Sequence, residues 1–129
     1  MILTTAALCL ALNIYHEARG EFIPGQYAVA LVTMNRAGHD ARNVCKVVTA
    51  KKQFSWTNKL VKKGALQPKG IPRDEDRWTT AQTIAKVVLS GKVTDFTEGA
   101  KYYHRYSVHP IWRHAFEQTK VLGRHIFYR

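Results

Sequence analysis

A glutamate at the end of an apolar segment is the most chemically suggestive feature of the sequence. Glu17 follows the apolar run 2–12 and stands close to Arg19, Gly20 and Glu21. The run is apolar at nearly every position, which predicts a buried helix that carries Glu17 to its edge. Burial raises the pKa of a carboxyl group, so Glu17 is a candidate general acid at neutral pH. The alternative is that Glu17 and Glu21 flank a helix end and pair with Arg19.

Histidines and aromatic residues gather in the last third of the chain: His104, His109, His114 and His125, with Tyr102, Tyr103, Tyr106, Trp112, Phe127 and Tyr128. Flat aromatic side chains beside hydrogen-bond donors suit a groove for sugar rings, but they also suit the core of a small sheet. Zinc is a further alternative. A helical metalloprotease motif needs a second histidine four residues after His16, but Gly20 stands at that position. The spacing of the later histidines matches a metal site only weakly. We therefore expect no metal and no cofactor.

The elements that position these residues can be predicted from hydrophobic spacing and from turn-forming residues. Pro24 suits a helix start, the acids Asp74, Glu75 and Asp76 suit the positive end of the third long helix, and Gly91 ends that helix. The predicted elements are helices over 24–37, 44–50 and 74–90, an exposed loop over 59–72, and strands in 101–104 and 116–128 with a turn at 122–124. We expect an α+β fold, mainly helical in the N-terminal two-thirds, with a small antiparallel β sheet or hairpin in the C-terminal third.

Length and cysteine content favour one compact unit. A chain of 129 residues buries roughly two-thirds of its unfolded surface as a single domain, so we expect one domain over residues 1–129, and a monomer. Cys9 falls in the apolar helix, where a free thiol behaves as a small hydrophobe, and we expect no disulfide with Cys45. The apolar run lacks a preceding basic residue and is too short to span a membrane. It is therefore interpreted as core, not as a signal peptide or an inserted segment.

The charge is strongly positive, with 20 Lys and Arg residues against nine acids and a formal net charge of +11. Such a surface attracts polyanions. No recognisable nucleic-acid-binding motif is present, and the basic residues are spread from Arg36 to Arg77. The anionic polymers of a bacterial envelope suit the same charge, and a solvated basic surface without a ligand is the third interpretation. We expect envelope polymers as partners and no specific nucleic acid.

Short motifs follow one another along almost the whole chain, at 15–21, 25–30, 34–36, 44–48, 53–55, 85–91, 95–100, 102–104, 109–112 and 123–129. In this order they resemble the SleB-type cell-wall hydrolases, the family of the spore-cortex-lytic enzyme. The resemblance implies a small lysozyme-like catalytic domain that cleaves peptidoglycan, with Glu17 of the Glu-Ala-Arg-Gly-Glu motif as catalytic acid. The matching motifs also suggest groove residues, namely Tyr15, Gln53, Phe54, Tyr102, Tyr103, His104 and His125.

The number of acids bears on the reaction. Glycoside hydrolysis ordinarily uses two carboxyl groups, and beyond Glu17 the candidates for a second one are Glu21, Asp95 and Glu98. A single well-placed acid favours a lytic transglycosylase. Glu17 would protonate the β-1,4 bond between N-acetylmuramic acid and N-acetylglucosamine, and would then help the muramyl 6-hydroxyl attack its own anomeric carbon. The alternatives are a muramidase, a metal-dependent cell-wall amidase or peptidase, and a basic nucleic-acid-binding module.

The interpretation of the apolar run as core leaves no targeting segment in the sequence as given. A phage lysis enzyme, held in the host cytoplasm until it is released to the cell wall, would fit this pattern. A bacterial enzyme exported by another route would fit it equally.

Overall fold

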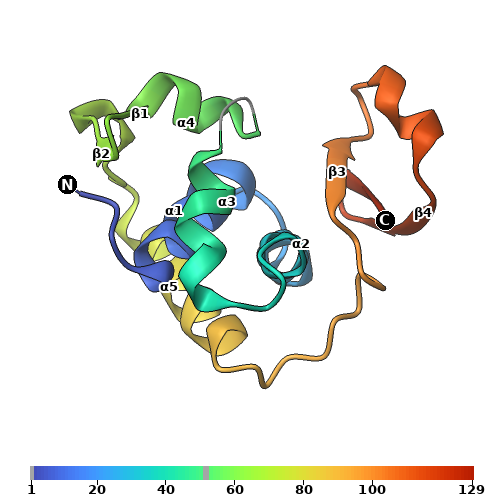
Figure 1. Cartoon of the computed structure of the whole chain (residues 1–129), viewed down its shortest axis with the longest axis horizontal. Coiled ribbons are helices and arrows are strands. Elements are labelled where there is room, and N and C mark those ends of the chain that lie inside the picture. Colours follow the sequence, from blue (N-terminus) through green and yellow to red (C-terminus); the bar gives the residue numbers. More distant parts are fainter. Residues whose placement is uncertain (1, 51–52) are drawn as a thin grey trace.

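The computed structural model describes residues 2–50 and 53–129; Met1 and the basic pair Lys51-Lys52 lie outside the described residues. The helices are α1 (Ala6–Ala18), α2 (Ile23–Arg36), α3 (Val44–Thr49), α4 (Ser55–Leu60) and α5 (Glu75–Leu89). Short 3₁₀ turns are η1 (Ala41–Asn43), η2 (Pro68–Gly70) and η3 (Ile111–Ala115), and the strands are β1 (Val61–Lys62), β2 (Ala65–Leu66), β3 (Tyr102–Arg105), β4 (Gln118–Leu122) and β5 (His125–Tyr128). The predicted α+β fold is confirmed, with the helices first and the larger sheet last (Figure 1).

Helix α1 is the centre of the helical part and packs against α2, α3 and α5. Its segment from Cys9 to Ile14 is buried, which confirms as core only the part of the apolar run from Cys9 to Leu12. The helix begins at Ala6 because the side chain of Thr5 accepts a hydrogen bond from the backbone N–H of Leu8 at 3.2 Å. The first residues therefore lie outside the helix, and Ile2 is 63% exposed.

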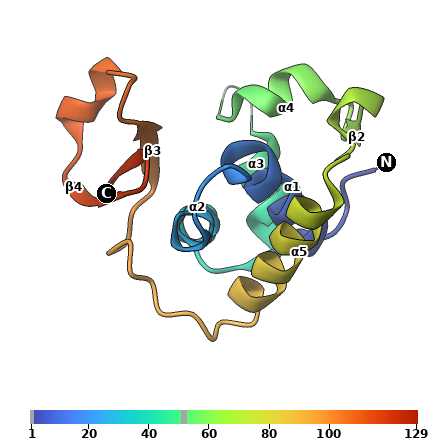
Figure 2. The same ribbon diagram turned by 180° about the vertical axis from the view of Figure 1, so that it is seen from behind.

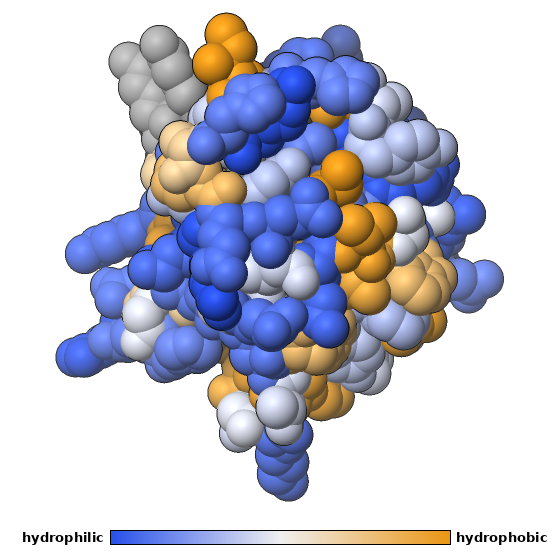
Figure 3. All heavy atoms as spheres, turned by 90° about the vertical axis from the view of Figure 1, so that its right-hand side faces the viewer, coloured by the Kyte–Doolittle hydropathy of each residue, from blue (hydrophilic) through white to orange (hydrophobic). Residues whose placement is uncertain are grey.

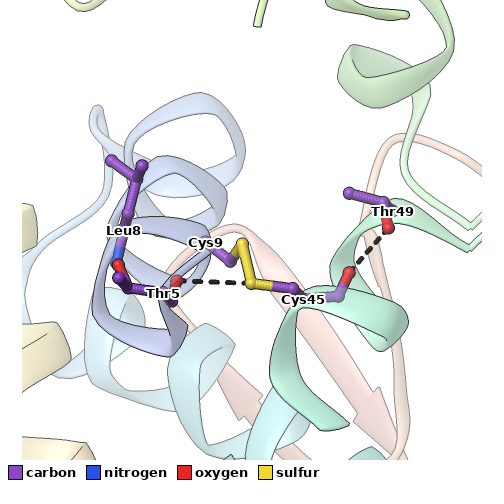
Figure 4. The surroundings of a disulfide bond; sticks show 5 residues. All are labelled: Thr5, Leu8, Cys9, Cys45 and Thr49. Atoms are coloured by element: carbon purple, nitrogen blue, oxygen red, sulfur yellow. Dashed lines mark hydrogen bonds between the residues drawn. A yellow bond between two sulfur atoms is a disulfide. The ribbon is translucent and has the colours of Figure 1, made fainter. Parts of the chain in front are cut away.

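The expectation of unbridged cysteines is wrong, because a disulfide joins Cys9 of α1 to Cys45 of α3 (Figure 4). The two helices pack side by side and bring the Cα atoms to 5.3 Å, within the usual range for a disulfide. The sulfur of Cys45 also lies 3.3 Å from the carbonyl oxygen of Thr5. Sequence analysis missed the bond because nothing local to either cysteine predicts that α3 packs on this face of α1.

The two long helices after α1 agree with prediction, whereas the loop after α4 contains more structure than expected. Helix α5 is capped by Asp74, whose carboxylate accepts from the N–H of Arg77 at 3.1 Å. Residues 59–72 include the antiparallel hairpin of β1 and β2, followed by η2. In the described part of the chain, none of the helices has the length and apolarity needed to cross a membrane.

The C-terminal sheet has the strand order β3-β5-β4, and both pairings are antiparallel. Gly123 forms the turn between β4 and β5 with a φ of 57°, as predicted for residues 122–124. A long segment after α5 runs back to β3, visible from both sides of the molecule (Figures 1 and 2). Asn35 of α2 ties this segment to the helices by donating to Asp95 and to the carbonyl of Ala100, both at 2.9 Å.

Candidate active site

A cleft of about 370 Å³ lies between the helical part and the sheet. It is lined by Glu17, Arg36, Gln53, Phe54, Lys101, Tyr102, Tyr103, Trp112 and Phe116. These residues come from the C-terminal ends of α1 and α2, the approach to α4, the start of β3, and η3 with the residue that follows it. The outer face on the sheet side is mostly hydrophilic, with apolar residues in separate groups (Figure 3).

Glu17 stands in the last turn of α1, and Oε1 accepts a hydrogen bond from the hydroxyl of Tyr103 at 2.6 Å. Burial raises the pKa of Glu17, while the bond from Tyr103 and the charge of Arg105 oppose that rise. Burial and the nearby Glu17 raise the pKa of Tyr103 well above its ordinary value, so its hydroxyl stays a donor. The pair forms a carboxyl group that keeps its proton to higher pH than an exposed glutamate does.

Aromatic rings form the opposite wall of the cleft. Tyr102 stacks on Phe116 with ring centroids 4.2 Å apart, and Trp112 packs edge-on against Phe116 at 6.1 Å. Flat rings of this kind present apolar area at low entropic cost, which suits the apolar faces of sugar rings. The cleft therefore combines a protonatable acid with an aromatic platform.

A buried amide positions the helix that follows Phe54 in the sequence. Asn13 of α1 is fully buried; its side chain donates to Thr33 at 3.1 Å and accepts from the indole of Trp56 in α4 at 3.0 Å. Trp56 also stacks on His16, one residue before Glu17. Because buried polar groups must be paired, these bonds fix α4 against α1 and hold Phe54 in the wall.

Five of the predicted site residues meet in the cleft: Glu17, Gln53, Phe54, Tyr102 and Tyr103. They come from three separate motifs of the sequence, and their roles toward a substrate stay predictions.

The other three predicted groove residues are not part of the cleft lining. The hydroxyl of Tyr15 accepts from the backbone N–H groups of Arg73 and Asp74 at the start of α5, at 3.3 and 3.2 Å. Both ring nitrogens of His104 have partners, the hydroxyl of Tyr128 at 2.8 Å and a backbone carbonyl. These contacts hold the scaffold together.

His125 is buried behind Tyr103, with the two rings edge to face at 5.2 Å. Its Nδ1 lies 3.3 Å from Oε1 of the buried Glu21. Burial lowers the pKa of His125, and Glu21 opposes that change. The ring of His125 also contacts that of Phe127, which packs in a small apolar cluster with Ala28, Val32 and Ala100. His125 thus supports Tyr103 from behind.

Sequence reasoning missed four lining residues: Arg36, Lys101, Trp112 and Phe116. Trp112 belonged to the aromatic cluster but had no motif-based role. The charge pattern alone makes Arg36 one of many spread cations, although Arg36 belongs to the motif at 34–36 and directly follows the apolar stripe of a predicted helix. That position at the end of α2 was the signal that could have singled it out.

The three candidates for a second catalytic carboxyl lie elsewhere. Glu21 pairs with His125 and with Arg124, the latter at 3.5 Å. Asp95 accepts from Thr97, Gly99 and Asn35 and shapes the segment before β3, and Glu98 is exposed. Among the described residues, Glu17 is the one acid in the cleft lining.

The four histidines weighed for zinc do not meet. His109 and His114 are exposed, while His104 and His125 are buried with the partners given above. Across residues 2–50 and 53–129, no three histidine, cysteine or acidic side chains gather at one point.

A family model for cell wall hydrolases matches residues 20–128 of the 129-residue chain. The chain belongs to the cell wall hydrolase family. The match begins three residues after Glu17, so it covers every other lining residue of the cleft.

Two solved structures extend the similarity over the whole fold. One is the catalytic domain of the germination-specific lytic transglycosylase SleB from Bacillus anthracis, at 26% identity and a TM-score of 0.72, covering 96% of this chain and 93% of that one. The other is the catalytic domain of the Bacillus cereus SleB protein, at 29% identity and a TM-score of 0.69, covering 96% and 90%. No curated protein matches.

Proposed function

We propose that this cell wall hydrolase is a lytic transglycosylase that cleaves the β-1,4 bond between N-acetylmuramic acid and N-acetylglucosamine in peptidoglycan. The family and the similarity to a lytic transglycosylase catalytic domain support this reaction class. The observation that carries the proposal is the state of Glu17: a carboxyl group in a cleft, with a raised pKa and one oxygen held by Tyr103. The domain spanning residues 1–129 is proposed to be one catalytic unit.

In the proposed mechanism, Glu17 first acts as an acid. Tyr103 donates to Oε1, which leaves Oε2 to carry the proton toward the glycosidic oxygen. As the bond to N-acetylglucosamine breaks, the leaving oxygen takes that proton and positive charge develops at the muramyl anomeric carbon. The Glu17 carboxylate then removes the proton from the muramyl 6-hydroxyl, whose oxygen attacks the same carbon and closes a 1,6-anhydro ring. Glu17 ends the cycle protonated, and no water is consumed.

The distribution of acids supports this outcome over hydrolysis. A two-carboxyl hydrolase places its second acid about 5–10 Å from the first, across the bond to be cut. In the described residues the cleft lining holds Glu17 alone among acids, whereas Glu21 and Asp95 are held by other partners. Intramolecular attack by a hydroxyl of the substrate removes the need for a second group to activate water.

The charge and the disulfide support a place of action in the bacterial envelope. A net charge of +11 attracts the anionic polymers of a cell wall. Disulfides persist in oxidising compartments outside the cytoplasm, and Cys9–Cys45 fits such a location. We propose that the enzyme works there as a monomer. Lysis of whole sacculi that does not weaken between about 0.05 and 0.5 M salt would argue against capture by charge.

Mass spectrometry of muropeptides released from purified sacculi tests the reaction. The proposal predicts chain ends with 1,6-anhydromuramic acid and no incorporation of ¹⁸O from labelled water. Reducing muramic acid ends with ¹⁸O at the anomeric carbon would identify a hydrolase. Cleaved peptide or amide bonds with intact glycan strands would contradict the proposal altogether.

A further inference from the structure

The cleft contains a cation whose environment the proposed acid chemistry does not explain. Arg36 is the last residue of α2, and its half-buried guanidinium lines the same cleft as Glu17. The neighbouring Asn35 fixes this end of α2 to the segment that leads into β3, through Asp95 and Ala100. Helix α2 lies between the other helices and β3 (Figure 1). The bonds of Asn35 therefore fix the backbone of Arg36 relative to the segment before β3.

The partners of Arg36 are neutral. Its Nη2 donates to the amide oxygen of Gln53, and its guanidinium lies 6.0 Å from the ring centre of Phe54 and 5.8 Å from that of Tyr102. These contacts hold the planar group between two rings but leave its charge uncompensated. Among the described residues, no carboxylate forms an ion pair with Arg36.

Three other arginines differ from Arg36 because each has a charged partner. Arg42, Arg77 and Arg129 lie at the surface, and each pairs with a carboxylate within 3.3 Å. A charged group that is partly removed from water without a partner is costly, so such an arrangement is typical of a binding site. Burial lowers the pKa of Arg36, yet a guanidinium stays charged at neutral pH because its ordinary pKa is so high.

The cleft as a whole favours an anion. Lys101 adds a second cation to the lining, and Glu17, the one acid there within the described residues, keeps its proton to higher pH than usual. The guanidinium has five N–H donors in a rigid fork that matches a carboxylate. Among the described residues, Gln53 alone accepts a hydrogen bond from it, so the group can bind a further acceptor.

We propose that Arg36 binds a carboxylate carried by the muramyl unit of the substrate and thereby selects peptidoglycan over uncharged glycans. This inference rests on the proposed function. Two carboxylates have the required chemistry: the lactyl carboxylate of muramic acid, free when the stem peptide has been removed, and a carboxylate within the stem peptide. Both belong to the same class of ligand, and the choice of substrates below distinguishes them.

The test compares the wild type with Arg36→Gln, Arg36→Lys and Arg42→Gln. Arg42→Gln removes the same charge from a side chain that is 89% exposed and remote from the cleft lining. The substrates are soluble glycan strands stripped of peptides, the same strands after methyl esterification, and strands that keep their peptides. Both KM and kcat are measured, together with binding by the fluorescence of Trp112 and the other tryptophans.

Arg36→Gln is expected to raise KM about 10- to 100-fold on strands with the recognised carboxylate, with a much smaller change in kcat. Arg36→Lys should recover part of this loss, and Arg42→Gln should behave as the wild type. Esterified strands should be cleaved equally by wild type and Arg36→Gln. A loss confined to peptide-free strands identifies the lactyl carboxylate, and a loss confined to peptide-bearing strands identifies the stem.

An equal loss on esterified and charged strands, or no loss on either, would overturn the role of Arg36. Failure of the Arg36 proposal is distinguishable from failure of the proposed function. If the wild type binds charged strands through Arg36 but leaves the glycan uncut, the carboxylate site stands and the transglycosylase assignment falls.

Discussion

The hydroxyl of Tyr103 lies 2.6 Å from Oε1 of Glu17, although 86 residues separate them in the sequence. The bond joins the last turn of α1 to β3, and both residues line the cleft, so the helical part and the sheet must be docked for this contact with the acid to form. Tyr103 stabilises the charged form of Glu17, whereas burial destabilises it more. The proton affinity of Glu17 is therefore set by burial on one side and by the Tyr103 bond and the charge of Arg105 on the other, and mutation can remove the Tyr103 bond alone.

Tyr103→Phe should shift the alkaline limb of the activity profile to higher pH. The substitution removes a hydrogen bond that lowers the pKa of Glu17, so the protonated acid should persist further into the alkaline range. The pH dependence of kcat/KM on sacculi measures this. Tyr102→Phe is the matched control, because Tyr102 lines the same cleft and its ring would remain. A limb that moves to lower pH in Tyr103→Phe would contradict this account of Glu17.

Glu17→Gln should make the protein more stable than the wild type at pH 7.5 and equally stable near pH 4. The folded-state pKa of Glu17 is raised above the unfolded value of 4.5, so the wild type loses stability as pH rises from 4.5 through the folded pKa. The glutamine variant lacks this loss, so its advantage over the wild type should grow between pH 4 and pH 7.5. Urea unfolding at both pH values measures it. The exposed Glu75→Gln serves as control and should show no such gain.

Removal of the disulfide should destabilise the fold. Cys9 and Cys45 close a loop with a sequence separation of 36. In the chain-entropy description, a loop of this size contributes about 3–4 kcal/mol to the free energy of unfolding. The double variant Cys9→Ala/Cys45→Ala should lose about that much in urea unfolding. A reducing agent should destabilise the wild type and leave the double variant unaffected; detection of two free thiols in the unreduced, denatured wild type would disprove the bond.

Much of the fold could be predicted from sequence because its signals are local. Three features each act within a few residues: the acids at the start of α5, Pro24 at the start of α2 and Gly123 at a turn. The disulfide and the position of the α2 end in the cleft depend on how the helices pack, which no local sequence pattern predicts.

The candidate site divides in the same way. The motif matches single out several aromatic residues as candidates for the site. They do not reveal which side chains of a strand reach the cleft. Tyr103 and His104 are adjacent on β3 and point to opposite faces, so one contacts Glu17 and the other contacts Tyr128. Tyr102 shares the face of His104 and still lines the cleft beside Tyr103, since β3 is an edge strand of its sheet. Alternation along a strand can be predicted, whereas the face that meets the helices cannot.

Millimolar EDTA should leave activity on purified sacculi unchanged, because the proposed proton transfers by Glu17 require no Lewis acid. His114→Ala should also be tolerated, since His114 is exposed on η3 and lies outside the cleft lining. Elemental analysis of the active protein gives an independent reading of bound zinc. Activity that EDTA abolishes and added zinc restores would favour a metal-dependent amidase or peptidase.

The most direct test of the central claim is the turnover of Glu17→Gln on purified sacculi, followed as soluble muropeptides with anhydro ends. Glutamine keeps the size of the side chain and can accept from Tyr103, but it cannot donate a proton to the leaving oxygen. We predict at least a ~100-fold fall in kcat with the fold intact. Glu21→Gln, which alters a buried acid outside the cleft lining, should reduce kcat much less. Equal losses at both positions would indicate a two-carboxyl hydrolase, and an active Glu17→Gln would contradict the account.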